Sequence, residues 1–122
     1  MLRSLFSSSK KSQGSRMTAV KQINAAELHQ WLDEADKPLL LVDVRTPGEF
    51  EYDGHIGGSQ LFPLSSLMAR MDELPKDQTI VCVCRSGARS YTACEMLASN
   101  GFDVVNLSGG MIGWKRANFL YK

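Results

Sequence analysis

Two runs of apolar residues dominate the hydrophobic pattern of the chain. Residues 39–44 and residues 79–83 are almost wholly apolar and rich in leucine, isoleucine and valine. Short continuous runs of this kind are typical of strands that are buried on both faces of a parallel sheet. A polar turn follows each run, and a helical pattern follows each turn. The two runs therefore predict neighbouring strands of an α/β protein.

The rest of the pattern alternates in the same way. Asn24 and Glu27 have the spacing of a capping box, which predicts the start of a helix, and Asn100 with Gly101 predicts the end of another. Strands are expected at 19–23, 60–62 and 104–107, and helices at 24–37, 46–50, 63–71, 91–98 and around Trp114. This alternation predicts a central parallel β-sheet flanked by helices on both faces.

The composition is that of an ordinary globular domain. The chain has 122 residues, of which 43% are hydrophobic and 22% charged, and one domain accounts for this length. It has no run of about 20 apolar residues, so we expect no association with a membrane. Three cysteines are an odd number, which favours a reducing compartment and a cytoplasmic protein.

Charge separates a tail from the rest of the chain. Residues 1–16 are rich in serine and contain four basic residues and no acidic one, whereas the remainder carries ten basic and thirteen acidic residues. We expect residues 1–16 to be a flexible tail and the mildly acidic remainder not to bind nucleic acid. Three interpretations of the tail stay open: an untargeted extension, a mitochondrial transit peptide, or a leader ahead of a start at Met17.

The candidate chemistry lies between the second apolar run and the helix after it. Cys84 ends the strand, and Arg85 and Arg89 follow it with no apolar side chain larger than alanine between them. The backbone N–H groups of such a turn point towards the space above the helix N-terminus, where an anion is stabilised. Both arginines also favour the thiolate form of the cysteine. The pattern indicates a nucleophilic cysteine, because the alternative of an ordinary buried cysteine leaves the two arginines unexplained.

This loop resembles the active-site loop of rhodanese-type sulfurtransferases, and the resemblance covers most of the chain. The matching segments are 84–90, 42–45 with 49–50, 54–56, 100–102 and 107–114. Their order and spacing are those of one rhodanese domain, which we place at residues 17–122. The chain departs from the family at Gly57 and Ser59, where proline and alanine are common. The resemblance implies a rhodanese-like fold and a sulfurtransferase such as a thiosulfate sulfurtransferase.

The resemblance also implies a mechanism. The Cys84 thiolate attacks the outer sulfur of an anionic donor such as thiosulfate, and cyanide or a thiol removes the sulfur from the resulting persulfide. Backbone N–H groups of the loop and the helix dipole stabilise the anion. Substrate binding is thereby assigned to Arg85, Ser86, Gly87, Ala88 and Arg89. Arg89 has a second interpretation, as a brace paired with Asp43 or Glu49.

Three further residues are expected to support the site. Asp43 interrupts a buried strand near its carboxyl end, and its interpretations as an ion pair with Arg45 and as support for the loop both stay open. Cys84 and Arg89 have a Cys-x4-Arg spacing, and Ser90 directly follows Arg89. Protein tyrosine phosphatases use Cys-x5-Arg, so Ser90 stands where their arginine would be. The shorter loop favours a site sized for one sulfur atom over one sized for a phosphate group.

The remaining candidates are assigned structural roles. Cys82 and Cys94 are expected to pack in the core, and His55 to hold its loop. No metal site is expected, because the two histidines are far from the cysteines in sequence, and no cofactor is expected. The expected partners are a small-molecule sulfur donor and a thiol or cyanide acceptor. The alternatives are a persulfide carrier that serves a protein acceptor, a non-catalytic rhodanese-like binding module, and a phosphatase or arsenate reductase.

Overall fold

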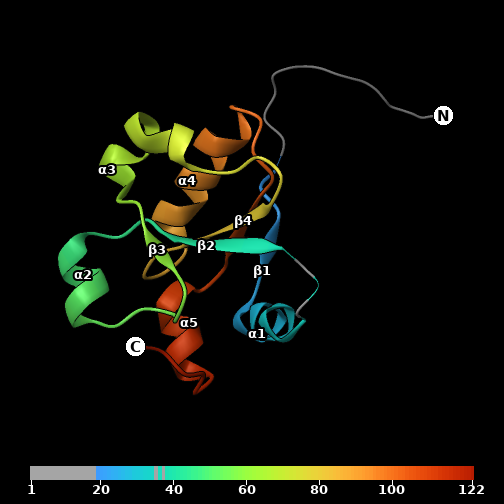
Figure 1. Ribbon diagram of the computed structural model, residues 1–122. Helices are drawn as coiled ribbons and strands as arrows, with labels where there is room; N and C mark the ends of the chain where they lie inside the picture. The colour runs from blue at the N-terminus through green and yellow to red at the C-terminus, as the bar shows by residue number, and fades with distance from the viewer. Residues whose placement is uncertain (1–18, 35, 37) are drawn as a thin grey trace.

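The alternation predicted from the sequence is present in the computed structural model, which describes residues 19–34, 36 and 38–122. Five strands form one sheet (Figure 1): β1 (Gln22–Ile23), β2 (Leu39–Asp43), β3 (Gln60–Leu61), β4 (Thr79–Val83) and β5 (Val104–Leu107). Their order across the sheet is β1-β5-β4-β2-β3, and every neighbouring pair is parallel. All strands therefore end at one edge of the sheet, with β4 in the middle. The expected parallel sheet is confirmed.

Helices cover both faces of this sheet, as predicted. The helical elements are α1 (Ala25–Asp33), α2 (Pro47–Tyr52), α3 (Leu64–Leu67), the 3-10 helix η1 (Met68–Glu73), α4 (Ala88–Ala98) and α5 (Gly110–Arg116). Figure 1 shows α3 and α4 on one face and α1 and α5 on the other. Leu67 and Leu97 are buried against the first face, whereas Leu28 and Trp114 are buried against the second. Each such side chain stabilises the fold by about 1.5–3 kcal/mol when fully buried.

Several element boundaries differ from the sequence prediction, and two of them bear on the site and on the sheet. Helix α4 begins at Ala88 and not at residue 91. Gly87 has φ +104°, which a residue with a side chain rarely adopts, and this conformation turns the chain into the helix three residues early. Strand β1 comprises only residues 22–23 of the predicted 19–23, because only Gln22 and Ile23 pair with β5. Ala88, Arg89 and Ser90 therefore occupy the first turn of a helix.

Capping residues fix the starts of α1 and α2. Asn24 and Glu27 form the predicted capping box at 2.9 Å in both directions. Thr46 and Glu49 form a second box at the start of α2, at 3.2 Å in both directions. In the 63–71 segment, Pro63 has an extended ψ of 139° and precedes the helix, which begins at Leu64.

Within the described part of the chain, no helix has the length and apolar character needed to cross a membrane. The interpretations of the basic tail concern residues 1–16, which lie outside the described residues. They stay predictions, and so does the boundary at Met17.

Candidate active site

The candidate nucleophile lies at the edge where the strands end, directly after the central strand β4. The Sγ atom of Cys84 accepts hydrogen bonds from the backbone N–H of Gly87 at 3.1 Å and from the hydroxyl of Ser90 at 3.3 Å. Cys84 is fully buried, whereas Arg85, Ser86 and Ala88 above it are exposed. A sulfur surrounded by donors in this way differs from an ordinary core thiol, which contacts apolar groups.

The hydrogen bonds make Cys84 more acidic than an ordinary cysteine. Burial acts in the opposite direction and raises the pKa, but donors from the Ser90 side chain and from the backbone of Ser90, Gly87 and Ser86 outweigh it. The net effect is a lowered pKa for Cys84. In contrast, a contact with Cys94 and burial raise the pKa of Cys82 well above its usual value. Of these two neighbouring thiols, Cys84 is therefore the more acidic.

A buried asparagine on β5 holds the loop from below. Asn106 is 1% exposed, and its side chain accepts from the Ser90 hydroxyl at 2.6 Å. Its amide nitrogen donates to the backbone carbonyl of Gly87 at 3.1 Å and to the side chain of Gln22 at 3.0 Å. Asn106 thus fixes two of the residues that contact Cys84 Sγ. The sequence analysis missed this residue, although an asparagine inside a buried strand signals that its amide needs partners.

Helix α5 holds the same loop from the opposite side. The backbone N–H groups of Met111 and Ile112 donate to the carbonyl oxygens of Cys84 and Arg85, at 2.9 and 3.1 Å. A Cβ atom on Gly110 would lie 2.4 Å from the Cys84 carbonyl oxygen, so the close approach requires glycine here. With these carbonyls directed towards α5, the loop keeps its own N–H groups available for the sulfur.

The two loop arginines have different surroundings. Arg89 forms a bidentate ion pair with Glu49, with both N–O distances at 2.7 Å. The hydrogen bond from Arg89 lowers the pKa of Glu49 to about 2, and the pair raises the pKa of Arg89. The guanidinium of Arg85 is exposed and has no hydrogen-bonding or ionic partner within the described segments. Of the two acids considered as partners of Arg89, the structure selects Glu49.

Asp43 and Arg45 form the ion pair that the sequence suggested. Both side chains are buried, at 1% and 2% exposure. The Nε and Nη2 groups of Arg45 donate to the Asp43 carboxylate at 2.9 and 2.8 Å, respectively. Arg45 Nη2 also donates to the carbonyl oxygen of Gly54 at 2.8 Å. The pair therefore ties the end of β2 to the loop that follows α2. Breaking such a buried pair typically costs about 3–5 kcal/mol.

The other candidate residues have structural surroundings. His55 stacks on Phe50 with a centroid separation of 3.6 Å, and its Nδ1 lies 2.8 Å from the Phe50 carbonyl oxygen. Cys82 and Cys94 are fully buried in the core that contains Cys84, and all three cysteines are free. Within the described ranges, no cluster of three histidine, cysteine or acidic side chains is arranged to hold a metal ion.

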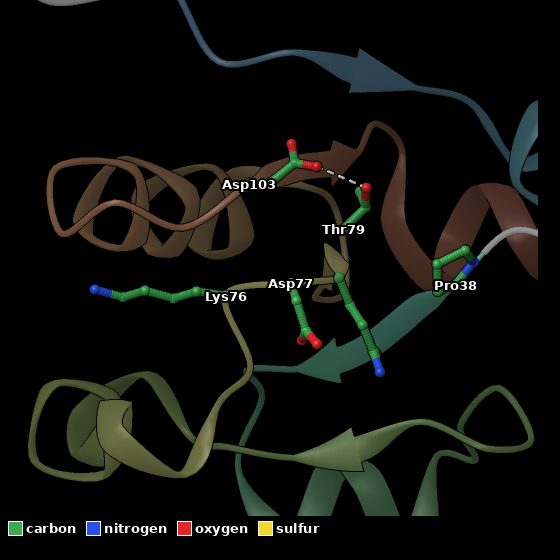
Figure 2. Close-up of a pocket in the computed structure, with 6 residues that line it drawn as sticks. Pro38, Lys76, Asp77, Thr79 and Asp103 are labelled. Atoms are coloured by element: carbon green, nitrogen blue, oxygen red, sulfur yellow. Dashed lines mark hydrogen bonds between the residues drawn. The ribbon is translucent and has the colours of Figure 1, made fainter.

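A polar pocket at the opposite edge of the sheet is too far away to take part. It has a volume of about 300 Å³ and is lined by Pro38, Lys76, Asp77, Gln78, Thr79 and Asp103. Figure 2 shows that Thr79 and Asp103, at one side of this pocket, are joined by a hydrogen bond. Its length is 2.7 Å. Thr79 begins β4 and Cys84 follows its end, so about 16 Å of strand separates them.

The candidate site of this α/β protein is a hydrogen-bonded thiol between a parallel strand and a helix N-terminus. Residues 24–117 match the model of the rhodanese-like domain family. The chain belongs to this family.

Individual relatives agree with this assignment. A protein named sulfurtransferase from Allochromatium vinosum is 44% identical over 98 residues, which cover 80% of this chain and 90% of the relative. The thiosulfate sulfurtransferase GlpE of Pseudoalteromonas translucida is 34% identical over 100 residues, covering 81% and 92%. A solved structure of a rhodanese-related protein from Thermoplasma volcanium has a TM-score of 0.77 at 29% identity, covering 84% and 97%. The fold is therefore rhodanese-like, as expected.

Proposed function

We propose that this protein is a sulfurtransferase that carries a sulfane sulfur on Cys84. The donor is an anion such as thiosulfate, and the acceptor is a thiol or cyanide. The observation that carries this proposal is the pair of hydrogen bonds that Gly87 and Ser90 donate to Cys84 Sγ. Donors in this position stabilise a thiolate before the reaction and the anionic persulfide after it. The names of the relatives support the same reaction class.

The reaction proceeds in two displacement steps. The Cys84 thiolate attacks the outer sulfur of thiosulfate, the sulfur–sulfur bond of the donor breaks, and sulfite leaves with the electron pair. The enzyme then holds the outer sulfur as a Cys84 persulfide. Cyanide or a thiolate attacks that sulfur, and the Cys84 thiolate leaves. No oxidant or reductant is needed, and the two steps predict ping-pong kinetics.

The loop residues divide the work in this proposal. Arg85 binds the negative charge of the donor, because its guanidinium is exposed and has no partner in the described chain. Arg89 acts as a brace that ties α4 to α2 through Glu49. Three donors surround the transferred sulfur: the backbone N–H groups of Ser86 and Gly87 and the hydroxyl of Ser90. Ala88 is exposed and has a small side chain, so it does not cover the outer face of the loop. Because Sγ itself is covered, the loop must shift to admit a donor.

The short Cys-x4-Arg loop favours sulfur transfer over phosphate hydrolysis. Arg89 is paired with Glu49, so its guanidinium is not available to bind a phosphate group in the loop. In this proposal Asp43 and Arg45 support the site by fixing the loop after α2. The same chemistry would serve a protein acceptor, since Arg85, Ser86 and Ala88 are exposed together above the cysteine.

Thiocyanate formation from thiosulfate and cyanide tests the proposal. We expect Cys84→Ser to abolish turnover while the fold is retained. Cys94→Ser serves as the matched control, because Cys94 is buried in the same core and makes no hydrogen bond to the loop. If Cys84→Ser turned over at the rate of the control, the proposed function would be wrong.

A further inference from the structure

A second cavity adjoins the loop on the side of α5. Its volume is about 310 Å³, and it is lined by Arg45, Asp53, Arg85, Met111, Ile112 and Lys115. We call it the α5 pocket. Its volume lies at the lower end of pockets that hold small organic molecules, about 300–1,000 Å³. Arg85 lines the α5 pocket and is bonded to Cys84, so the pocket begins one residue from the nucleophile.

The polar groups of the α5 pocket have unused bonding capacity. Arg85 and the carboxylate of Asp53 make no hydrogen bond or ion pair with any described residue. Arg45 is 2% exposed and bonds through Nε and Nη2. Its Nη1 group has no partner among the described residues. A buried guanidinium nitrogen without an acceptor is unfavourable. A ligand oxygen in the pocket would supply that acceptor.

The charges define what such a ligand carries. Arg45 is neutralised by Asp43, which leaves Arg85 and Lys115 against the single carboxylate of Asp53. Lys115 donates to the backbone carbonyl of Asp53 and lies over the Tyr121 ring at 4.7 Å, so it is held beside the pocket. Two cations and one anion suit a ligand with a carboxylate group for the arginines and lysine and an ammonium group for Asp53.

We propose that the α5 pocket binds the sulfur acceptor, and that this acceptor is a small thiol bearing a carboxylate and an ammonium group, such as an amino-acid thiol. This inference rests on the proposed function and specifies its acceptor. The acceptor thiol passes its proton to the anionic Cys84 persulfide, and the resulting acceptor thiolate attacks the outer sulfur. A new sulfur–sulfur bond forms, the Cys84 thiolate leaves, and the product is the persulfide of the acceptor. The transferred sulfur keeps the proton that the acceptor supplied, so no further reactant is required.

Direct binding tests the pocket without the chemistry. The Cys84→Ser protein is titrated with S-methylcysteine, whose thioether cannot react, and with its methyl ester, which lacks the carboxylate. We expect the acid to bind and the ester to bind more weakly. We expect Lys115→Gln to raise the Kd of the acid by about three- to tenfold, the range of a partly exposed charged contact. Arg116→Gln is the matched control: Arg116 lies on the same helix, is exposed and does not line the pocket.

Acceptor kinetics provide the second measurement. For persulfide-loaded protein, the KM for cysteine relative to the KM for mercaptoethanol should rise in Lys115→Gln and stay unchanged in Arg116→Gln. Equal binding of acid and ester, or equal effects of the two substitutions, would overturn the inference. The inference would also be overturned if the Cys84→Ser protein bound inorganic thiosulfate but not S-methylcysteine. Should Cys84 fail to take up sulfur, the proposed function fails, but the titration still decides whether the pocket binds this ligand class.

Discussion

Replacing Ser90 with alanine removes a donor from the Cys84 sulfur. The Ser90 hydroxyl lies 3.3 Å from Sγ and 2.6 Å from the Asn106 side-chain oxygen. A hydroxyl has one proton, so it can donate to only one of these two acceptors at a time. A hydrogen bond to a charged group is worth about 1.5–3 kcal/mol. Because the proton is shared, we take the lower end, so losing the hydroxyl destabilises the thiolate by about 1.5 kcal/mol and raises the pKa of Cys84.

The thiolate absorbance in the ultraviolet, followed against pH, measures this change. The curve of a Cys84→Ser protein is subtracted to isolate the Cys84 signal. Ser86→Ala is the matched control, since Ser86 contributes only its backbone N–H, which alanine retains. We expect the midpoint to rise in Ser90→Ala and to stay in place in Ser86→Ala. Circular dichroism checks that Asn106, which loses a donor, has not disturbed the fold.

An unchanged midpoint in Ser90→Ala would refute the reasoning. It would mean that the hydroxyl donates to Asn106 in both ionisation states. The acidity of Cys84 would then rest on the backbone N–H groups and on the charge of the arginines. An equal shift in Ser86→Ala would also contradict the account, because it would reflect a general disturbance of the loop.

Three further predictions concern the framework of the site. Because Arg89 lowers the pKa of Glu49 to about 2, the ion pair stabilises the fold above a pH of about 4.5 and loses this effect as the pH falls towards 2. The free energy of unfolding in urea should therefore fall by about 1 kcal/mol less on acidification in Glu49→Gln than in the unmodified protein. This figure is reduced for solvent exposure. Gly110→Ala should destabilise the fold by about 2 kcal/mol or more in the same assay, because its φ of +53° is strained for alanine and its Cβ would collide with the loop carbonyls. Gly113→Ala should not destabilise the fold, because a Cβ atom added there meets no atom closer than 4.0 Å. Equal losses of stability in the two variants would contradict this prediction. Inserting one glycine between Ala88 and Arg89 turns the following helix by about 100°, which separates the ion pair between Arg89 and Glu49. Thiocyanate formation should then fall about a hundred- to a thousandfold. An unchanged rate would show that loop size does not matter.

The sheet and the position of Cys84 were predictable because both depend on local patterns. Strands β2 and β4 are almost wholly apolar, and runs of this kind are typical of buried strands in a parallel sheet. Cys84 directly follows β4, so its place at the edge where the strands end follows from the sequence. The capping box at Asn24 was equally local, since its two partners lie three residues apart.

The supports of the loop were not predictable, because they come from distant parts of the chain. Asn106 is 16 residues from Ser90, and its partner Gln22 is 84 residues away. The contact of Gly110 with the Cys84 carbonyl depends on how α5 packs against the loop, and no periodicity encodes that. The early start of α4 depends on the left-handed conformation of Gly87, which a glycine permits but does not require.

The central claim is that Cys84 carries the transferred sulfur. Intact-protein mass spectrometry after incubation with thiosulfate, followed by removal of the excess, tests it most directly. We expect the protein to gain the mass of one sulfur atom, to lose it on addition of cyanide, and to show no gain in Cys84→Ser. A Cys84→Ser protein that gained the same mass, or an unmodified protein that gained none, would contradict the account.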